Sequence, residues 1–243
     1  MFVLKTDVIS RRELLRASSA GLAAMSAQSL RAQSATDARV SVIDGGGANV
    51  VVCEDASGRI VVDSGTAKFD AKDLAKGCRV LFNTHYHLDQ TANNEVFAAA
   101  GATIVAHDRT RQFLSVERWI PEEDRWEPAR PKAALPTSTF IGDGSMTVGT
   151  QRIDYGYLLM AHTSGDIYVY FRESNVLAVG DIASPVRDPE LDWFTGAWIG
   201  GRVDAMDTIL KLANDQTRIV PAYGPSMTKA EFRKERDMME EIR

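Results

Sequence analysis

Three of the four histidines in the chain stand at positions typical of metal ligands. His85 and His87 are two residues apart after the apolar run 80–82, and Asp89 follows two residues later. Side chains at i and i+2 of an extended segment project to the same side, so these three share one rim. The third histidine, His162, comes much later in the chain. Because imidazole suits zinc, and a catalytic zinc commonly keeps three protein ligands, the pattern predicts one metal site.

The segments around these residues resemble the metallo-β-lactamase superfamily, whose signature is His-x-His-x-Asp-His at the end of a strand. The resemblance covers most of the chain after about residue 38. It includes the glycine-rich opening strand at 46–52 and the strand and Asp-Ser-Gly turn at 60–65. Later in the chain it includes the histidine loop at 162–166, an aspartate segment at 179–181 and a Pro-Ala-Tyr-Gly-Pro segment at 221–225. It implies an α/β (α+β) fold, the four-layer αββα sandwich.

The resemblance implies a first metal position that is complete in this chain. The family builds this position from the residues that match His85, His87 and His162, and the residue that matches Asp181 is able to bridge to it. All four residue types are present. We therefore expect one tightly bound zinc ion here.

The second metal position of the family departs from the pattern at two residues. It is built from the residues that match Asp89, Gln90, Asp181 and Tyr223, and the family has histidine where this chain has Gln90 and Tyr223. A neutral amide oxygen is a poorer ligand than imidazole, and a phenol with a pKa near 10 must first lose its proton. We therefore expect a weak or empty second site.

The expected chemistry is metal-assisted hydrolysis. A zinc ion lowers the pKa of a bound water from about 15.7 to near 7 and so provides a hydroxide nucleophile. Asp89 would orient that nucleophile and transfer a proton, and Tyr223 would donate to a substrate oxygen. Tyr223 is equally well interpreted as a packed aromatic at the end of a strand. The resemblance implies an ester, lactone, thioester or amide-type small molecule as substrate.

Two alternatives remain open at this point. Some superfamily members are oxidative and hold iron with two histidines and an aspartate, which His85, His162 and Asp181 provide. The altered second site is also consistent with a non-catalytic periplasmic protein that binds a metal or a ligand. The fourth histidine, His107, is interpreted as structural, with a supporting role near the metal as the alternative.

Composition and charge agree with one exported domain. The chain has 243 residues, of which 44% are apolar, enough for one sizeable core in residues 38–243. A net charge of −5 argues against nucleic acid or anionic membrane as a partner.

Residues 1–34 carry the pair Arg11-Arg12 before an Ala/Ser-rich stretch too short and polar to span a bilayer. They are predicted to be a twin-arginine-type signal peptide leading to the periplasm, or else an amphipathic arm that is never cut.

The periodicity of apolar residues predicts alternating strands and helices. Strands are expected at 40–43, 49–53 and 59–63, as an antiparallel meander, and at 80–84, 103–106, 145–160, 166–172, 175–179 and 218–220. Helices are expected at 68–76, 91–100, 202–213 and from 228 onward, where Thr228 and Glu231 have the spacing of a capping box. Residues 111–140, with four prolines, are predicted to be a covering loop, either a lid or an inert crossing. Cys53 and Cys78 are expected to be buried free thiols, although an oxidising compartment also permits a bridge.

Overall fold

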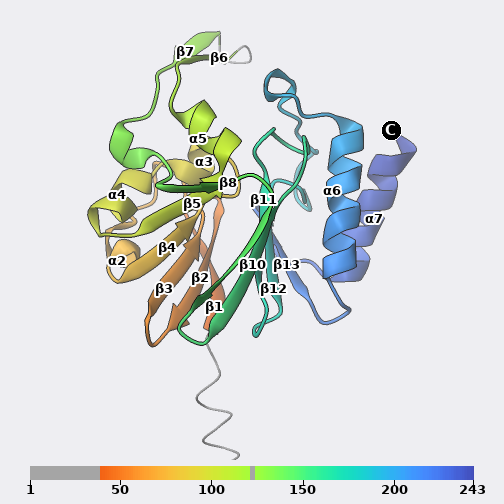
Figure 1. Ribbon diagram of the computed structural model, residues 1–243. Helices are drawn as coiled ribbons and strands as arrows, with labels where there is room; N and C mark the ends of the chain where they lie inside the picture. The colour runs from red at the N-terminus through yellow and green to blue at the C-terminus, as the bar shows by residue number, and fades with distance from the viewer. Residues whose placement is uncertain (1–38, 121–123) are drawn as a thin grey trace, which may run out of the picture. The chain divides into compact units, whose positions relative to one another are not determined.

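The computed structural model describes residues 39–120 and 124–243 (Figure 1). Residues 38–243 form one compact unit. The predicted signal peptide, residues 1–34, lies outside the described residues. Within the described ranges, no helix combines the length and the apolar character needed to cross a membrane.

The first sheet has six strands in the order β1-β2-β3-β4-β5-β8. The strands are β1 Arg39–Asp44, β2 Asn49–Asp55, β3 Gly58–Val62, β4 Cys78–Phe82, β5 Thr103–His107 and β8 Ser138–Phe140. The first three form the antiparallel meander that the sequence predicts. From β3 onward the pairs are parallel, so each connection must cross over the sheet and carries a helix.

The second sheet has five strands in the order β13-β12-β11-β10-β9. The strands are β9 Asp143–Val148, β10 Gln151–Tyr157, β11 Ile167–Phe171, β12 Val176–Gly180 and β13 Arg218–Pro221. Neighbours are antiparallel except β12 and β13, which are parallel and joined through helix α6 Ile199–Leu212. Every residue of β11 and β12 is buried, as expected for strands covered on both faces.

The two sheets pack face to face and each carries helices on its outer face (Figure 1). Alternate residues of β2, such as Val51 and Cys53, join residues of the second sheet in the central core. Val50 and Val52 instead pack with the helical segment between β3 and β5. The other outer layer consists of α6 and of α7 Lys229–Glu241. The predicted αββα sandwich is confirmed.

The predicted helix at 91–100 is wrong in one respect, because two short helices stand in its place. These are α3 Leu88–Thr91 and α4 Asn94–Ala99. The Thr91 hydroxyl donates back to the carbonyl of His87 at 2.9 Å, and the Asn93 amide bonds to backbone carbonyls of residues 64–66. Side chains that bond locally to the backbone compete with helix continuation, which explains the break. The predicted helix at 68–76 is also shorter, α2 Lys72–Ala75.

The segment expected to be one covering loop contains regular structure. It holds α5 Asp108–Leu114, a hairpin of β6 Arg118–Ile120 and β7 Arg125–Glu127, a 3-10 turn at Lys132–Ala134, and β8. Strand β8 pairs with β5 and extends the first sheet, so this part of the loop prediction is wrong. Pro128 directly follows β7 and Pro136 comes two residues after the 3-10 turn, so these prolines separate short elements and do not exclude regular structure.

Two local predictions are confirmed elsewhere. Helix α7 begins with the expected capping box, in which the Thr228 hydroxyl accepts from Glu231 N–H and the Glu231 carboxylate accepts from Thr228 N–H. Cys53 and Cys78 are free, buried thiols that belong to different core clusters. Burial raises the pKa of each thiol to about 12.

Candidate metal centre

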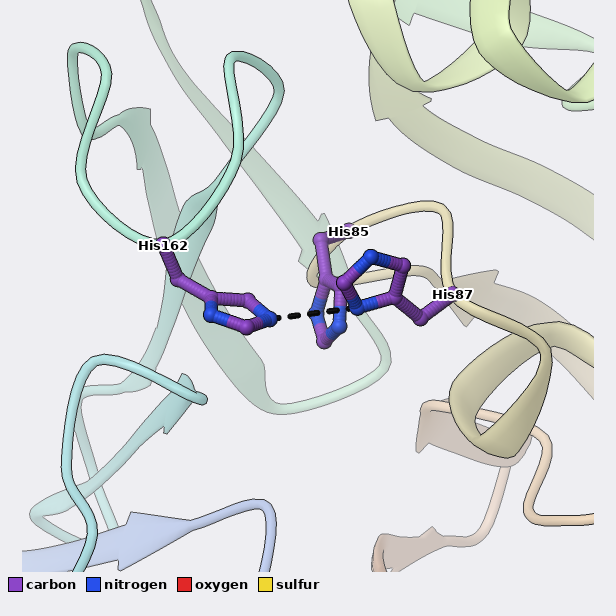
Figure 2. Close-up of side chains that lie close together, drawn as sticks. All are labelled: His85, His87 and His162. Atoms are coloured by element: carbon purple, nitrogen blue, oxygen red, sulfur yellow. Dashed lines mark hydrogen bonds between the residues drawn. The ribbon is translucent and has the colours of Figure 1, made fainter. Parts of the chain in front are cut away.

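Three imidazole rings converge between the two sheets. His85 and His87 follow strand β4, and His162 lies in the loop between β10 and β11. Their ring centroids are 4.8 to 5.0 Å apart, and one ring nitrogen from each lies within 4.8 Å of the others. Figure 2 shows the three rings turned toward one another. The convergence predicted from the sequence is present.

The hydrogen bonds of His85 determine which of its nitrogens faces the centre. The Thr84 hydroxyl donates to the Asp63 carboxylate at 2.8 Å, so its oxygen is left to accept from His85 Nδ1, 3.1 Å away. His85 Nε2 therefore carries a lone pair. That atom is buried and has no hydrogen-bond partner among the described residues. Burial of an unpaired polar atom is costly, so His85 Nε2 requires a partner that is not a protein atom.

His162 is oriented in the same way from the other sheet. Its Nδ1 lies 2.9 Å from the carbonyl of Glu190, which can only accept, so Nδ1 carries the proton and Nε2 a lone pair. The loop itself is held by Asp166, whose carboxylate accepts from the backbone N–H groups of His162 and Thr163 at 2.7 Å.

His87 completes the set through its other nitrogen. Its Nε2 lies 3.3 Å from the Asp192 carboxylate. Burial alone would raise the pKa of Asp192, but hydrogen bonds from His87 and Tyr86 outweigh it and lower the pKa to about 2. Asp192 is thus an ionised acceptor that fixes the proton of His87 on Nε2. His87 Nδ1 then faces His162 Nε2 at 3.1 Å, where a proton on His87 Nδ1 bonds to His162 Nε2 and a metal ion would take the place of that proton.

A carboxylate oxygen joins the three nitrogens. Asp181 directly follows β12 and is buried, and its Oδ2 lies 3.6 Å from His85 Nε2 and from His162 Nε2. Within the described ranges this oxygen has no hydrogen-bond partner. Three imidazole nitrogens and one carboxylate oxygen are a donor set that zinc accepts. The residues present therefore fit a divalent cation.

Burial also sets the protonation of the ligand histidines. It is the largest cause that lowers the pKa of His85 and of His162, and the neighbouring imidazoles lower both further. A neutral imidazole is the form that binds metal, so these two rings are ready for a cation near neutral pH. Burial is the largest effect on His87 and opposes its charge, but the hydrogen bond to Asp192 and the nearby carboxylates of Asp89 and Asp181 together outweigh burial and raise the pKa of His87.

A glycine lets the ends of β4 and β12 approach closely. Gly180 has φ +57°, and a Cβ at this position would lie 2.8 Å from Thr84 Oγ1. Thr84 is the residue that orients His85, and Gly180 precedes Asp181. A side chain here would therefore strain the backbone and separate two of the metal-facing groups at once.

The opposite side of the site contains both departures from the family pattern. The Tyr223 hydroxyl donates to Asp89 Oδ2, and the Gln90 amide lies 3.4 Å from the same oxygen. Burial, and then the charge of Asp89, raise the pKa of Tyr223, so the phenol keeps its proton. The structure thus brings together the residues that the sequence assigned to the second position, but as partners of one another.

Several contributors to the site were missed by the sequence analysis. Asp192 orients His87, and the buried Arg202 of α6 donates to the Glu190 carbonyl at 3.1 Å and lies 3.6 Å from Glu235 of α7. Arg187 donates to Asp181 Oδ1 at 2.6 Å. These residues come from an irregular segment or from a helix face, where no motif or spacing marks them. A buried arginine at a core position of a helix is recognisable only after the packing is known.

His107 has a structural position. Its ring stacks on Tyr157 with centroids 3.9 Å apart, its Nε2 lies 3.1 Å from the carbonyl of Ile141, and its Nδ1 accepts from Arg109 N–H at the start of α5. These contacts anchor a helix and a strand end, as the sequence interpretation expects.

A cavity of about 430 Å³ opens beside the metal-facing groups. His87, Asp89 and Asp181 are among its polar lining residues, together with Arg118, Arg187 and Asp192. Its walls include the aromatic and aliphatic side chains of Leu88, Phe113, Trp119, Ile120, Leu191 and Phe194. The β6–β7 hairpin supplies part of this wall, so the segment predicted to cover a substrate entrance does border the cavity.

Comparison with known proteins identifies a family and a fold. The sequence model of the Metallo-beta-lactamase superfamily matches residues 43–224. A metallo-beta-lactamase from Pontibacter korlensis superposes with a TM-score of 0.64 at 16% identity, over 83% of this chain and 93% of that chain. The DIM-1 metallo-beta-lactamase gives a TM-score of 0.64 at 18% identity, over 84% and 93%. An archaeal superfamily protein from Sulfolobus tokodaii gives 0.62 at 14% identity, over 83% and 86%.

Proposed function

The chain belongs to the metallo-beta-lactamase superfamily, and on that basis we propose that it is a zinc-dependent hydrolase. Its substrate is an ester, lactone, thioester or amide-type small molecule. The observation that carries the proposal is the convergence of three imidazole lone pairs and the unpartnered Asp181 Oδ2 on one point. His85, His87, His162 and Asp181 would hold the ion. When bound, zinc supplies Lewis acidity and lowers the pKa of water toward 7.

Asp89 is proposed to orient the attacking water and to accept its proton. The side chain is half-buried, lines the cavity, and comes from the same loop as His85 and His87. A carboxylate in this position acts as a general base when it is within hydrogen-bond reach of the nucleophile.

Tyr223 is proposed to donate a hydrogen bond to the substrate oxygen that gains charge. In the structure its hydroxyl donates to Asp89, so this role requires an exchange of acceptor when the substrate binds. The raised pKa of Tyr223, caused first by burial, supports a donor role because the proton stays on the phenol.

The cavity supports a small substrate with an apolar group. Its volume falls in the range of about 300 to 1,000 Å³ that is usual for small-molecule sites. Phe113, Trp119 and Phe194 provide aromatic surface in the lining of the cavity. An apolar substituent of the substrate would pack there while its reacting carbonyl faces Asp89 and the metal-facing groups.

The test is metal analysis combined with a substrate panel. The protein is stripped with a chelator, reloaded with zinc, and assayed on chromogenic lactam, lactone, ester and thioester substrates. We expect zinc to bind and zinc-dependent turnover on at least one substrate class. Zinc binding without turnover on any class would contradict the hydrolase and favour a metal- or ligand-binding protein.

One observation favours a second candidate, an iron-dependent oxidative enzyme. Asp181 Oδ2 is 3.6 Å from both His85 Nε2 and His162 Nε2, so two histidines and one carboxylate form a compact set of the kind that holds iron. Elemental analysis of protein purified from its natural compartment distinguishes the two, because iron in place of zinc would contradict the hydrolase.

We further propose that the chain is exported to the periplasm by the twin-arginine route. The pair Arg11-Arg12 supports this proposal. Fractionation of bacteria that produce the full chain should give periplasmic protein, and substitution of both arginines by lysine should leave it in the cytoplasm. Unchanged export of that variant would contradict the route.

A further inference from the structure

Arg187 contacts two residues that match ligands of the family's second metal position. Its guanidinium donates to Asp181 Oδ1 at 2.6 Å. The guanidinium carbon also lies 3.7 Å from the ring centroid of Tyr223. A guanidinium is planar and always charged, so it pairs with a carboxylate through its N–H groups while it stacks on an aromatic ring. One side chain thus spans the space between Asp181 and Tyr223.

The remaining groups on this side do not fit a metal ion. Asp89 Oδ2 already accepts from the Tyr223 hydroxyl, which cannot serve as a ligand while it keeps its proton. Gln90 Oε1 is buried without a partner among the described residues. A single neutral amide oxygen is a poor ligand for a divalent ion, and the positive charge of Arg187 at Asp181 opposes a second cation there.

We propose that the Arg187 guanidinium takes the place of the second metal ion. It provides a permanent positive charge beside Asp181, so that the chain binds one metal ion and excludes a second. This inference rests on the proposed metal site of His85, His87 and His162, and it assigns to a protein side chain the position that the resemblance gives to an ion. The charge cannot be removed by a chelator.

The position of Arg187 at the cavity also gives the charge access to a bound molecule. Its side chain is about one third exposed and lines the cavity with Asp181 and Asp89. Loss of two imidazoles alone would leave a second site that binds metal weakly. A guanidinium at that site would in addition repel a second metal ion. The two explanations differ in what happens when the imidazoles are restored.

The experiment restores the missing ligands with and without Arg187. Gln90→His/Tyr223→His, the double variant, is equilibrated with excess zinc, freed of unbound metal and analysed for zinc per chain. We expect about one ion per chain for the unaltered protein and for this double variant. Adding Arg187→Gln should raise the value to about two, whereas adding Arg187→Lys, which keeps the charge, should leave it at about one.

Arg118 provides a matched control. It lines the same cavity, pairs with Glu127 and lies over the ring of Tyr86. Adding Arg118→Ala to the double variant removes a neighbouring arginine and should leave about one ion per chain. Titration with cobalt(II), followed by its visible absorption, counts the same sites independently of activity, and circular dichroism confirms that each variant is folded.

The outcomes separate this inference from the proposed function. Two ions in the unaltered protein, two in the double variant that retains Arg187, or one in the folded variant with Arg187→Gln would each overturn the role of Arg187. Absence of any bound ion in the unaltered protein would instead overturn the proposed function itself.

Discussion

The two sides of the site differ in residue type and in the partners of their polar atoms. On the side of His85, His87 and His162, the outward nitrogen of each ring faces a protein oxygen, and the inward nitrogens of the three rings face one another. On the side of Asp89 and Tyr223, a protein donor already occupies the inward-facing oxygen. The difference teaches that metal binding depends on which atom of each side chain is left without a partner. Residue type alone predicts that the second side binds metal more weakly, and the hydrogen bonds show which of its atoms already have a partner.

Loss of one imidazole should abolish metal binding altogether. In His162→Ala only two of the inward lone pairs remain, and zinc sites normally need three or four protein ligands. We expect zinc per chain and zinc-dependent turnover to fall to background in elemental analysis and in the substrate assay. His107→Ala, which removes a histidine that stacks on Tyr157, should retain the metal. Normal metal content in His162→Ala would contradict the assignment of the metal to the three histidines.

Arg202, which holds the Glu190 carbonyl that orients His162, should contribute strongly to the stability of the fold. Arg202 is fully buried between Glu235 and the Glu190 carbonyl. Arg202→Met leaves Glu235 without its charged partner, and breaking a buried pair in this way costs about 3–5 kcal/mol of unfolding free energy. Urea unfolding of the metal-free protein measures the loss.

The same pair of helices offers a control for that measurement. Arg236 of α7 bonds to Asp207 of α6 at 2.7 Å near the surface, and exposed pairs contribute at most about 1 kcal/mol. Equal destabilisation by Arg236→Met and Arg202→Met would show that the buried arginine has no special role behind the metal centre.

A change on the opposite side should alter turnover and leave the metal in place. In Tyr223→Phe the donor to Asp89 is lost, and removal of a donor to a developing oxyanion lowers turnover about 10²- to 10³-fold. The zinc content should stay the same. Tyr170→Phe, which removes a hydroxyl bonded to Asn175, is the matched control and should leave both unchanged. A loss of zinc in Tyr223→Phe would show that this side also holds the ion.

The smallest expected effect concerns the acceptor behind His87. Asp192→Asn keeps the shape but removes the charge that fixes the proton on His87 Nε2. Loss of such a supporting partner lowers metal affinity about 10- to 100-fold. Competition with a zinc chelator of known affinity measures it. Unchanged affinity would mean that His87 is oriented by its ring packing alone.

Much of the fold follows from local patterns in the sequence. Short β-rich runs separated by glycines predict the meander at residues 40–63, and the capping box at Thr228 predicts the start of α7. Each depends on neighbours within a few residues, where propensity and hydrogen bonding are decided. The divided helix after Thr91 and the added strand β8 were missed because distant partners decide them. Asn93 bonds to residues 64–66, and β8 pairs with β5.

The sequence by itself determined which residue types could bind a metal and that two of the family's ligands are replaced. Ligand chemistry belongs to the side chain and is visible in its spacing. Only the tertiary structure decided which nitrogen of each histidine faces inward and where the Arg187 guanidinium lies. Those outcomes depend on acceptors such as Glu190 and Asp192, which are distant in sequence from the rings they orient and are brought there by the packing of two sheets.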